Sequence, residues 1–430
     1  MDVQPFRGLR YNPALAAPAA VVAPPYDVID TAGRERLAAQ SPYNIVHVDL
    51  PEDGYAQAAA RLRQWMDDGA LTAEPRPALY AYRQAYRGPG GQELVRWGLT
   101  GMVRIAAYGE GIVFPHERTL PKPKDDRLQL MRATRTHLSP VFGLCFGASA
   151  SVDELLPAAC QQPPAIAVAD GDGVEHALWV LTDPNAIQRI QAALAPARIV
   201  IADGHHRYET ALAFRDEERA RTGDQPQAAW NYVMMALVDL ESPGLTVLPT
   251  HRILTGVAGI TGAELVQRLA GTFVLTPVDL ADRPKVPALL SELAALGPVP
   301  GFAVYTGGAG WIARLADDGA WRAVTADKPG AWRELDVTVL HGLALERAAG
   351  LDAAAQGSGT YLRYTRDAAE AVAAVDAGQG QAAFLVRPTP PESVRDIALA
   401  GHSMPQKSTY FYPKLLTGLV MAQLDTPVGL

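Results

Sequence analysis

The order of apolar and polar residues along the chain predicts helices and strands in alternation. Within residues 53–68, apolar side chains recur at helical spacing from Tyr55 to Trp65, which is typical of an amphipathic helix. Two segments with alternating apolar residues follow, 78–87 and 94–106, and a Gly-Pro-Gly-Gly sequence separates them. This arrangement indicates a β-hairpin.

Beyond residue 140 the pattern repeats as strand and helix. The expected strands cover 141–147, 197–202 and 231–240, and the expected helices cover 125–137, 152–159, 185–194 and 208–220. Further hairpins are expected around Gly171 to Gly173 and within residues 302–315. The sequence therefore predicts an α/β fold of mixed α+β type.

The chain is long enough for two or three structural units, each with its own core. We expect an N-terminal α/β unit with the first hairpin in residues 1–120, a central unit in residues 121–260 and a C-terminal α/β unit in residues 261–430. No internal repeat is evident. The boundary near residue 260 is approximate, because the Pro- and Ala-rich stretch that would mark a connection lies further along the chain, at 281–300.

Composition narrows the classes of protein. Of 430 residues, 48% are hydrophobic and 20% are charged, which is globular composition. The formal net charge of −8 provides no general attraction to phosphate backbones, so we expect no nucleic-acid partner. Cys145 and Cys160 lack CxxC spacing, which argues against a disulfide framework or a structural zinc site.

An apolar run at residues 14–25 superficially resembles a signal peptide, but prolines interrupt it. No other stretch approaches the ~18 uninterrupted apolar residues of a membrane span. We therefore expect a cytoplasmic protein with no membrane partner.

The most informative chemistry follows an apolar strand at Asp203. Gly204 comes next, and His205, His206 and Arg207 then open a charged helix. A tight turn at a helix N-terminus binds anions through free N–H groups and the helix dipole, and the basic side chains would add donors. In the plain alternative, Asp203 only caps the helix. A metal site built from Asp203, His205 and His206 is a weaker alternative, because adjacent helical residues do not share a face.

A second polar cluster lies in the preceding loop and helix. His116, Glu117 and Thr119 are followed by Lys124 and Arg127. The Glu117 carboxylate could serve as a base or a metal ligand, and the cations could neutralise phosphate. The sequence lacks the second histidine of the HExxH zinc-protease motif. A solvated charged loop is the alternative interpretation.

Two smaller clusters complete the candidates. Tyr26 and Asp27 follow two prolines in a rigid turn, although turn chemistry alone could explain them. Residues 401–408 approach a phosphate-binding Walker A loop, but Gln406 stands in place of the second glycine. We therefore reject that identity and keep Lys407 as a residue that could line a polar pocket, with a surface loop as the alternative.

These motifs together resemble a widespread prokaryotic family known as domain of unknown function 1015. The motifs are APPYDVI (23–29), PHERT (115–119), KxDR (124–127), DGHHRYETA (203–211), NYVMMAL (231–237), LPTHR (248–252) and MPQKSTYFYPK (404–414). The resemblance spans nearly the whole chain, and it implies a soluble protein associated with serine biosynthesis.

The DGHHR element at residues 203–207 also resembles the phosphate-binding strand-turn-helix of the ParB and sulfiredoxin superfamily, which includes free-serine kinases. In these kinases, an earlier carboxylate and the Asp of this element act on the serine hydroxyl and the metal. The resemblance implies catalytic and metal-binding roles for Asp203 and proposes Glu117 as the earlier carboxylate. Sulfiredoxins place a reactive Cys in this element, and none lies between Ile201 and Arg207, which argues against sulfinic acid reduction.

Residue chemistry and resemblance together predict phosphoryl transfer from ATP or ADP, with Mg²⁺, to a small hydroxyl metabolite. Free L-serine, giving O-phosphoserine, is the leading candidate. Glu117 would be the base and would converge on the turn at Asp203. The phosphates would contact Gly204, His205, His206, Arg207, Lys124, Arg127 and Lys407, and the substrate would contact Tyr26, Asp27, His116 and Thr119. Phosphate-ester hydrolysis and a non-catalytic, nucleotide-binding regulator are the alternatives, and a homodimer is left open.

Overall fold

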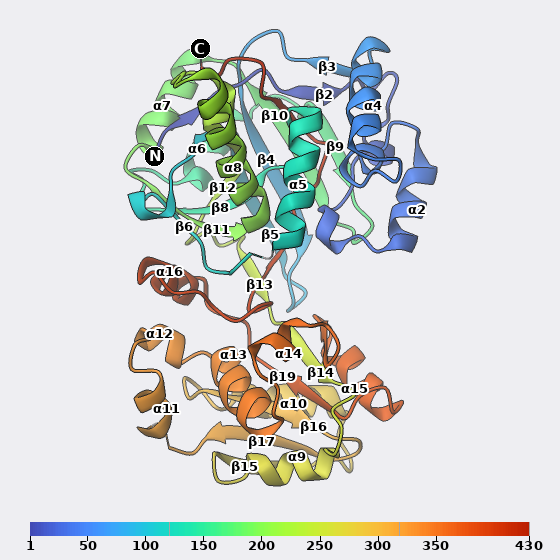
Figure 1. Cartoon of the computed structure of the whole chain (residues 1–430), viewed down its shortest axis with the longest axis vertical. Helices are drawn as coiled ribbons and strands as arrows, with labels where there is room; N and C mark the ends of the chain where they lie inside the picture. The colour runs from blue at the N-terminus through green and yellow to red at the C-terminus, as the bar shows by residue number, and fades with distance from the viewer. Residues whose placement is uncertain (120, 318, 430) are drawn as a thin grey trace. The chain divides into compact units, whose positions relative to one another are not determined.

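The computed structural model describes every residue except 120, 318 and 430. Contacts divide the chain into two compact units, which can be followed by residue number in Figure 1. The first unit comprises Met1–Pro115, Thr119–Thr246 and Phe411–Leu430, and the second comprises His116–Arg118 and Val247–Tyr410. The sequence suggested three parts that meet near residues 120 and 260. Strands from the first two of these parts share one sheet, so they form a single unit.

The first unit is built on a mixed sheet with the strand order β6-β11-β8-β12-β5-β4-β10-β9, and β1 pairs with β5. Its strands are β1 (Val3–Gln4), β4 (Leu79–Arg87), β5 (Glu93–Arg104), β6 (Val113–Phe114), β8 (Val141–Phe146), β9 (Ile166–Ala169), β10 (Glu175–Leu181), β11 (Arg198–Asp203) and β12 (Tyr232–Asp239). Pairs β6/β11 and β8/β12 are parallel, whereas β8/β11 and β4/β5 are antiparallel. The predicted hairpins and the mixed α/β class are confirmed.

Helices of the first unit lie against this sheet and against one another. They include α1 (Pro18–Val21), α2 (Thr31–Gln40), α3 (Val46–Asp49), α4 (Tyr55–Asp67), α5 (Pro121–Thr134), α6 (Val152–Ala159), α7 (Pro184–Leu194) and α8 (His205–Thr222). The apolar stripe predicted for α4 is confirmed, since Leu62 and Trp65 join a buried cluster with Leu9 and Tyr11. Helix α8 packs on β8 and β12, and α5 packs beside α8.

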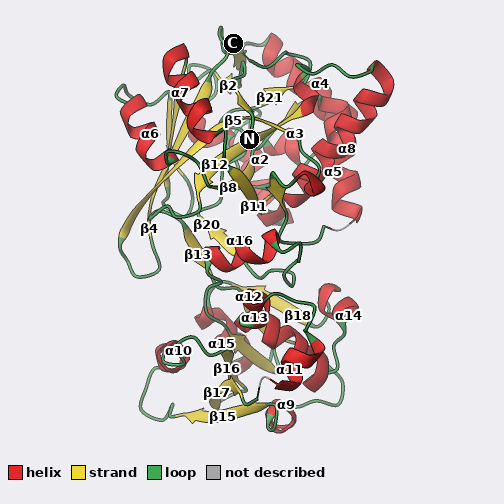
Figure 2. Ribbon diagram, turned by 90° about the vertical axis from the view of Figure 1, so that its left-hand side faces the viewer, coloured by secondary structure: helices red, strands yellow, loops and turns green. Residues whose placement is uncertain are grey.

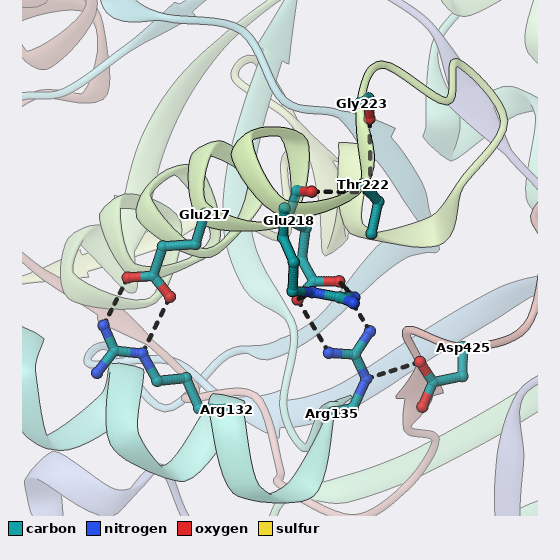
Figure 3. A network of polar contacts seen from close by, with 8 residues as sticks. Arg132, Arg135, Glu217, Glu218, Thr222, Gly223 and Asp425 are labelled. Carbon is teal, nitrogen blue, oxygen red and sulfur yellow. Dashed lines mark hydrogen bonds and ion pairs between the residues drawn. The ribbon is translucent and has the colours of Figure 1, made fainter.

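Ion pairs join α5 to α8 (Figure 3). Arg132 at the end of α5 contacts Glu217 of α8 at 2.5 Å, and Arg135 contacts Glu218 at 3.1 Å and Asp425 at 2.7 Å. Because several charges share the network around the buried Glu218, it holds the two helices more firmly than a single exposed pair would. Helices α5 and α8, which carry Lys124, Arg127 and Arg207, are therefore fixed against each other.

The second unit has an antiparallel sheet, shown with its helices in Figure 2. Its order is β15-β17-β16-β19-β14-β18. The strands are β14 (His251–Leu254), β15 (Phe273–Val278), β16 (Gly301–Tyr305), β17 (Gly310–Leu315), β18 (Leu362–Thr365) and β19 (Ala382–Leu385). Helices α10 (Lys285–Ala294) and α15 (Ala368–Asp376) contribute Leu289, Leu293 and Val372 to a core with the strands. The hairpin predicted within 302–315 is confirmed as β16 and β17.

The remaining helices of the second unit are α9 (Gly262–Leu269), α11 (Gly319–Val324), α12 (Gly330–Arg333), α13 (Asp336–Val339), α14 (Ala353–Gly357) and α16 (Pro391–Leu399). A π-helix, Leu340–Ala348, continues directly from α13. Both cysteines are free thiols. Among the described helices, none combines the length and the apolar character that crossing a membrane requires.

Candidate functional site

The turn between β11 and α8 forms the centre of the site. Strand β11 is buried through Ile199, Val200 and Ile201, and it ends at Asp203. Gly204 has φ +89° and ψ 31°, a left-handed conformation that glycine adopts at the least cost. A Cβ atom at this position would lie 2.8 Å from Nε of Arg207. The glycine is therefore required both by the backbone and by the side chain that passes over it.

Asp203 is held between two cations. Its Oδ2 lies 3.1 Å from Nη2 of Arg207, and its Oδ1 lies 3.4 Å from Nζ of Lys414. Burial alone would raise the pKa of Asp203, but the charges of Lys414, Arg207 and His205 outweigh burial and lower it to about 2. Gly204 occupies the N-cap position, and no side chain caps the helix. Asp203 is therefore an ionised, ion-paired carboxylate, and the alternative in which it only caps α8 is wrong.

Arg207 is anchored inside the first unit. Its Nη1 donates to the hydroxyl of Ser139 at 3.1 Å and to the carbonyl oxygen of Pro140, while Nη2 contacts Asp203. Its Nε is buried and has no hydrogen-bond partner. A buried donor without a partner costs about 1–3 kcal/mol, so this atom points to a missing acceptor.

Arg127 of α5 organises a neighbouring buried group. Its Nη1 donates to the backbone oxygen of Asp49 at 2.9 Å and to Asp49 Oδ1 at 3.0 Å. Asp126 accepts from Arg127 Nε at 2.7 Å, and the guanidinium carbon lies 4.2 Å from the ring centre of Tyr26. Tyr26 thereby covers one face of the cation. Burial raises the pKa of Tyr26 to about 12, so its hydroxyl stays protonated.

Asp49, at the end of α3, is the second buried residue with a polar atom that lacks a hydrogen-bond partner. Its Oδ2 has no hydrogen-bond partner, although the residue is only 5% exposed. Burial raises the pKa of Asp49, and the charges of Arg127 and Arg207 oppose that rise. A cationic group placed against Oδ2 would satisfy the atom and favour the ionised carboxylate.

Among the described residues, the two buried side-chain atoms without a hydrogen-bond partner, Asp49 Oδ2 and Arg207 Nε, belong to residues that line one small cavity of about 40 Å³. Its polar lining residues are Tyr26, Asp49, Arg127, Thr136, His137, Ser139, Arg207 and Thr210, and its apolar ones are Leu130, Met131, Leu138 and Val141. Burial lowers the pKa of His137 to about 4, so its imidazole is neutral at pH 7. The cavity is thus lined by both residues of the described chain that carry a buried polar atom without a hydrogen-bond partner.

A second polar group gathers around Glu209 on α8. Its carboxylate accepts from Thr119 at 2.7 Å and from Lys124 at 2.9 Å, and Tyr108 is at 3.5 Å. Burial lowers the pKa of His206, while the charge of Glu209 raises it. Lys124 and Thr119 therefore contact α8 through a carboxylate that was not among the candidates.

The structure places the predicted residues in two groups. Residues of the first unit are Tyr26, Asp27, Thr119, Lys124, Arg127, Asp203, Gly204, His205, His206 and Arg207, whereas His116, Glu117 and Lys407 belong to the second unit. In the second unit, His116 Nε2 lies 3.0 Å from Thr409 Oγ1, and Lys407 has φ +57° in an exposed position. The convergence of Glu117 on Asp203 stays a prediction.

Sequence reasoning missed Asp49, Ser139, Glu209 and Lys414. Glu209 lies inside DGHHRYETA and Lys414 ends MPQKSTYFYPK, so both were within motifs already noted. Asp49 stands alone at the end of the apolar segment IVHV, and a carboxylate in that position was the available signal. Ser139 gave none. Within the described residues, no three His, Cys, Asp or Glu side chains are grouped so that they could hold a metal ion.

Comparisons with solved structures give distant similarities. A conserved hypothetical protein from Pyrococcus furiosus has 14% identity, with 73% of this chain and 92% of that chain covered and a TM-score of 0.35. A free serine kinase in complex with AMP has 15% identity, with 71% and 88% covered and a TM-score of 0.35. SbnI with C-terminal truncation, from Staphylococcus aureus, has 10% identity, with 76% and 87% covered and a TM-score of 0.36.

A search of the curated proteins gave no match. The sequence model of a family described as "Protein of unknown function (DUF1015)" matches residues 3–338. This match covers well over half of the chain, and the resemblance noted from the motifs is confirmed. The chain belongs to the DUF1015 family.

Proposed function

We propose that the first unit takes part in phosphoryl transfer from a nucleotide to a small hydroxyl metabolite, with free L-serine as the acceptor. The observation that carries the proposal is the position of Asp203 between two cations. This residue is an ionised carboxylate at a strand-to-helix turn, with Arg207 at 3.1 Å and Lys414 at 3.4 Å. Phosphoryl transfer requires positioned charges more than covalent chemistry, and this turn supplies both signs.

The cavity supports the choice of an amino acid as acceptor. Oδ2 of Asp49 is an acceptor suited to an ammonium group, and Nε of Arg207 is a donor suited to a carboxylate. At about 40 Å³ the cavity is too small for a nucleotide, and it would have to widen to admit L-serine. We propose that the zwitterion of L-serine satisfies these two atoms.

In the proposed reaction, the serine hydroxyl oxygen forms a bond to the terminal phosphorus of the nucleotide. The bond between that phosphorus and the bridging oxygen breaks, and the shortened nucleotide leaves with the electron pair. The hydroxyl proton passes to a carboxylate, for which Glu117 remains our candidate. Asp203 contacts the lining residue Arg207 at 3.1 Å and would orient the hydroxyl from beside the cavity. The N-terminus of α8, with Lys124 and the two histidines, would face the phosphates.

The proposed magnesium ion would travel with the nucleotide. Magnesium is usually held by one or two carboxylates together with substrate phosphates. Asp203 already has Arg207 and Lys414 beside it, and these charges do not favour a resident dication in the absence of phosphate. We therefore treat Mg²⁺ as part of the nucleotide substrate and assign it no fixed site.

The test is incubation of the full chain with Mg²⁺, L-serine and, in separate reactions, ATP, ADP or pyrophosphate, with products read by mass spectrometry. We expect O-phosphoserine from the wild type and none from Asp203→Asn. Asp425→Asn is the matched control, because Asp425 is also an ion-paired carboxylate of the first unit but contacts Arg135 in the network of Figure 3. Release of free phosphate without phosphoserine would favour the hydrolase alternative, and nucleotide binding without turnover would favour the regulator.

A further inference from the structure

The second unit contains a hollow of about 480 Å³, which is within the usual range for small-molecule sites, ~300–1,000 Å³. Its lining residues belong to the second unit and include Arg118, Lys328, Trp332, His341, Glu346 and Tyr364. The function proposed above assigns nothing to this hollow.

Aromatic side chains form part of the lining. Trp332 of α12 donates its indole N–H to the backbone oxygen of Ser403 at 3.1 Å, and its ring stacks on Trp321 with centroids 5.7 Å apart and an interplanar angle of 22°. Its orientation is therefore fixed from two sides. Tyr364 supplies a second ring. Fixed aromatic faces of this kind bind planar rings by stacking.

Positive charge lies beside these rings. Nζ of Lys328 is 6.0 Å from the ring centre of Trp332, and Arg118 is exposed on the lining. Behind the lining, the fully buried Arg252 contacts Tyr364 through its guanidinium, 5.5 Å from the ring centre. Burial lowers the pKa of Arg252 to about 10, so it remains charged at neutral pH, while the charge of Glu117 acts on it from the same unit. Glu346 is the carboxylate of the lining, and the exposed Asp327 pairs with Lys328 at 2.7 Å, so a bound anion would share Lys328 with that carboxylate.

His341, one of the two histidines of the lining, is held neutral. Burial and the charge of Arg252 lower the pKa of His341 to about 3. Its Nε2 accepts from Nε of Arg252 at 3.3 Å, so Nδ1 carries the proton and donates to Gln356 Oε1 at 2.6 Å. This network fixes the position of Arg252, which also donates to the backbone oxygen of Lys407 at 3.0 Å.

Two irregular backbone segments meet at the hollow. His341 lies in the π-helix Leu340–Ala348, and such segments are frequent at functional sites. Lys407, which follows the lining residue Gln406, has φ +57°. Left-handed conformations at non-glycine residues cost free energy and cluster at ligand sites. One irregular segment therefore contributes to the lining, and a second directly follows the lining residue Gln406.

We propose that this hollow binds an anionic compound with a planar ring, of the size of a mononucleotide. The ring lies against Trp332, and the phosphate or carboxylate group contacts Lys328 and Arg118. The site belongs to the second unit and is independent of the transfer reaction proposed for the first.

The test is isothermal titration calorimetry of the full chain with AMP, with adenosine and ribose 5-phosphate as probes that each lack one half of the ligand. We expect AMP to bind at least tenfold more tightly than either fragment, and to quench tryptophan fluorescence in the wild type but not in Trp332→Phe. Lys328→Gln is expected to weaken AMP binding about tenfold, the loss of one charge-assisted contact. Lys285→Gln is the matched control, since Lys285 is a lysine of the same unit that pairs with an aspartate, as Lys328 does, but lies outside the lining of the hollow.

The proposal is overturned if AMP does not bind at millimolar concentration, if the fragments bind as well as AMP, or if the two lysine variants behave alike. Repeating the titration with Asp203→Asn separates the two proposals. AMP binding that depends on Lys328 in this inactive variant supports the second site whatever the outcome for phosphoserine formation. Turnover without such binding rejects the second site alone.

Discussion

Replacing Gly204 by alanine tests the geometry of the β11–α8 turn. At φ +89° and ψ 31° an alanine pays the left-handed backbone cost of about 1–2 kcal/mol. Its Cβ would also stand 2.8 Å from Nε of Arg207, so the arginine must move. Arg207 would then lose its contacts with Ser139 and Asp203, of which a charge-assisted one contributes about 1.5–3 kcal/mol. We expect Gly204→Ala to lower the free energy of unfolding by about 3–5 kcal/mol.

Gly111 provides a matched control in the same unit. It has φ +70° and ψ 24°, and a Cβ there would meet nothing within 4 Å. Gly111→Ala should therefore lower the free energy of unfolding by the backbone cost alone, about 1–2 kcal/mol. Urea unfolding followed by circular dichroism gives both values. Adding Arg207→Ala to Gly204→Ala removes the clash, so the double variant should lose less than the sum of the two single losses. Equal losses for the two glycine variants, or strict additivity in the double variant, would refute this account of Arg207.

Three further predictions address the charges. Lys414→Met removes the cation that lowers the pKa of Asp203 most and should raise that pKa above about 2, so the acid limb of the pH profile of kcat/KM should move to higher pH. An unchanged acid limb would contradict the Asp203–Lys414 ion pair. His137 has a pKa of about 4 in the folded state, below its unfolded value of ~6.5, so the unfolded state binds the proton first and the free energy of unfolding decreases by up to about 1.4 kcal/mol per pH unit as pH falls from 6.5 to 4. His137→Asn should flatten that part of the stability profile, and an unchanged slope would show that His137 does not cause it. Glu117→Gln should lower kcat about 10²–10⁴-fold with little change in KM for serine, and near-normal kcat would exclude it as the base.

The β11–α8 turn could be predicted from sequence because its signals are local. An apolar run followed by Asp203-Gly204 and a charged segment defines strand, turn and helix without reference to the rest of the chain. The period of the apolar residues likewise placed α4 within one or two residues of its observed limits. These elements depend on backbone preference and on one buried face, and both are visible in a single segment.

The partners of Asp203 could not be predicted in the same way. Lys414 comes from the C-terminal segment that returns to the first unit, 211 positions after Asp203 along the sequence. Asp49 of α3 forms an ion pair with Arg127 of α5 because folding of the first unit brings these two helices together. Such pairs depend on tertiary contacts between distant segments, which periodicity and spacing do not encode. The sequence predicted that Arg207 contacts the phosphate, whereas its guanidinium already donates to Ser139, Pro140 and Asp203.

We propose that Asp203 serves phosphoryl transfer to serine, and the most direct test is the rate of O-phosphoserine formation by Asp203→Asn, measured beside the wild type and Asp425→Asn. Thermal melts of all three proteins establish that they are folded. Our account predicts phosphoserine formation by the wild type and the control at similar rates, and a loss of at least 10²-fold in Asp203→Asn. Near-normal formation of phosphoserine by folded Asp203→Asn, or none by the wild type with any of the three donors, would contradict it.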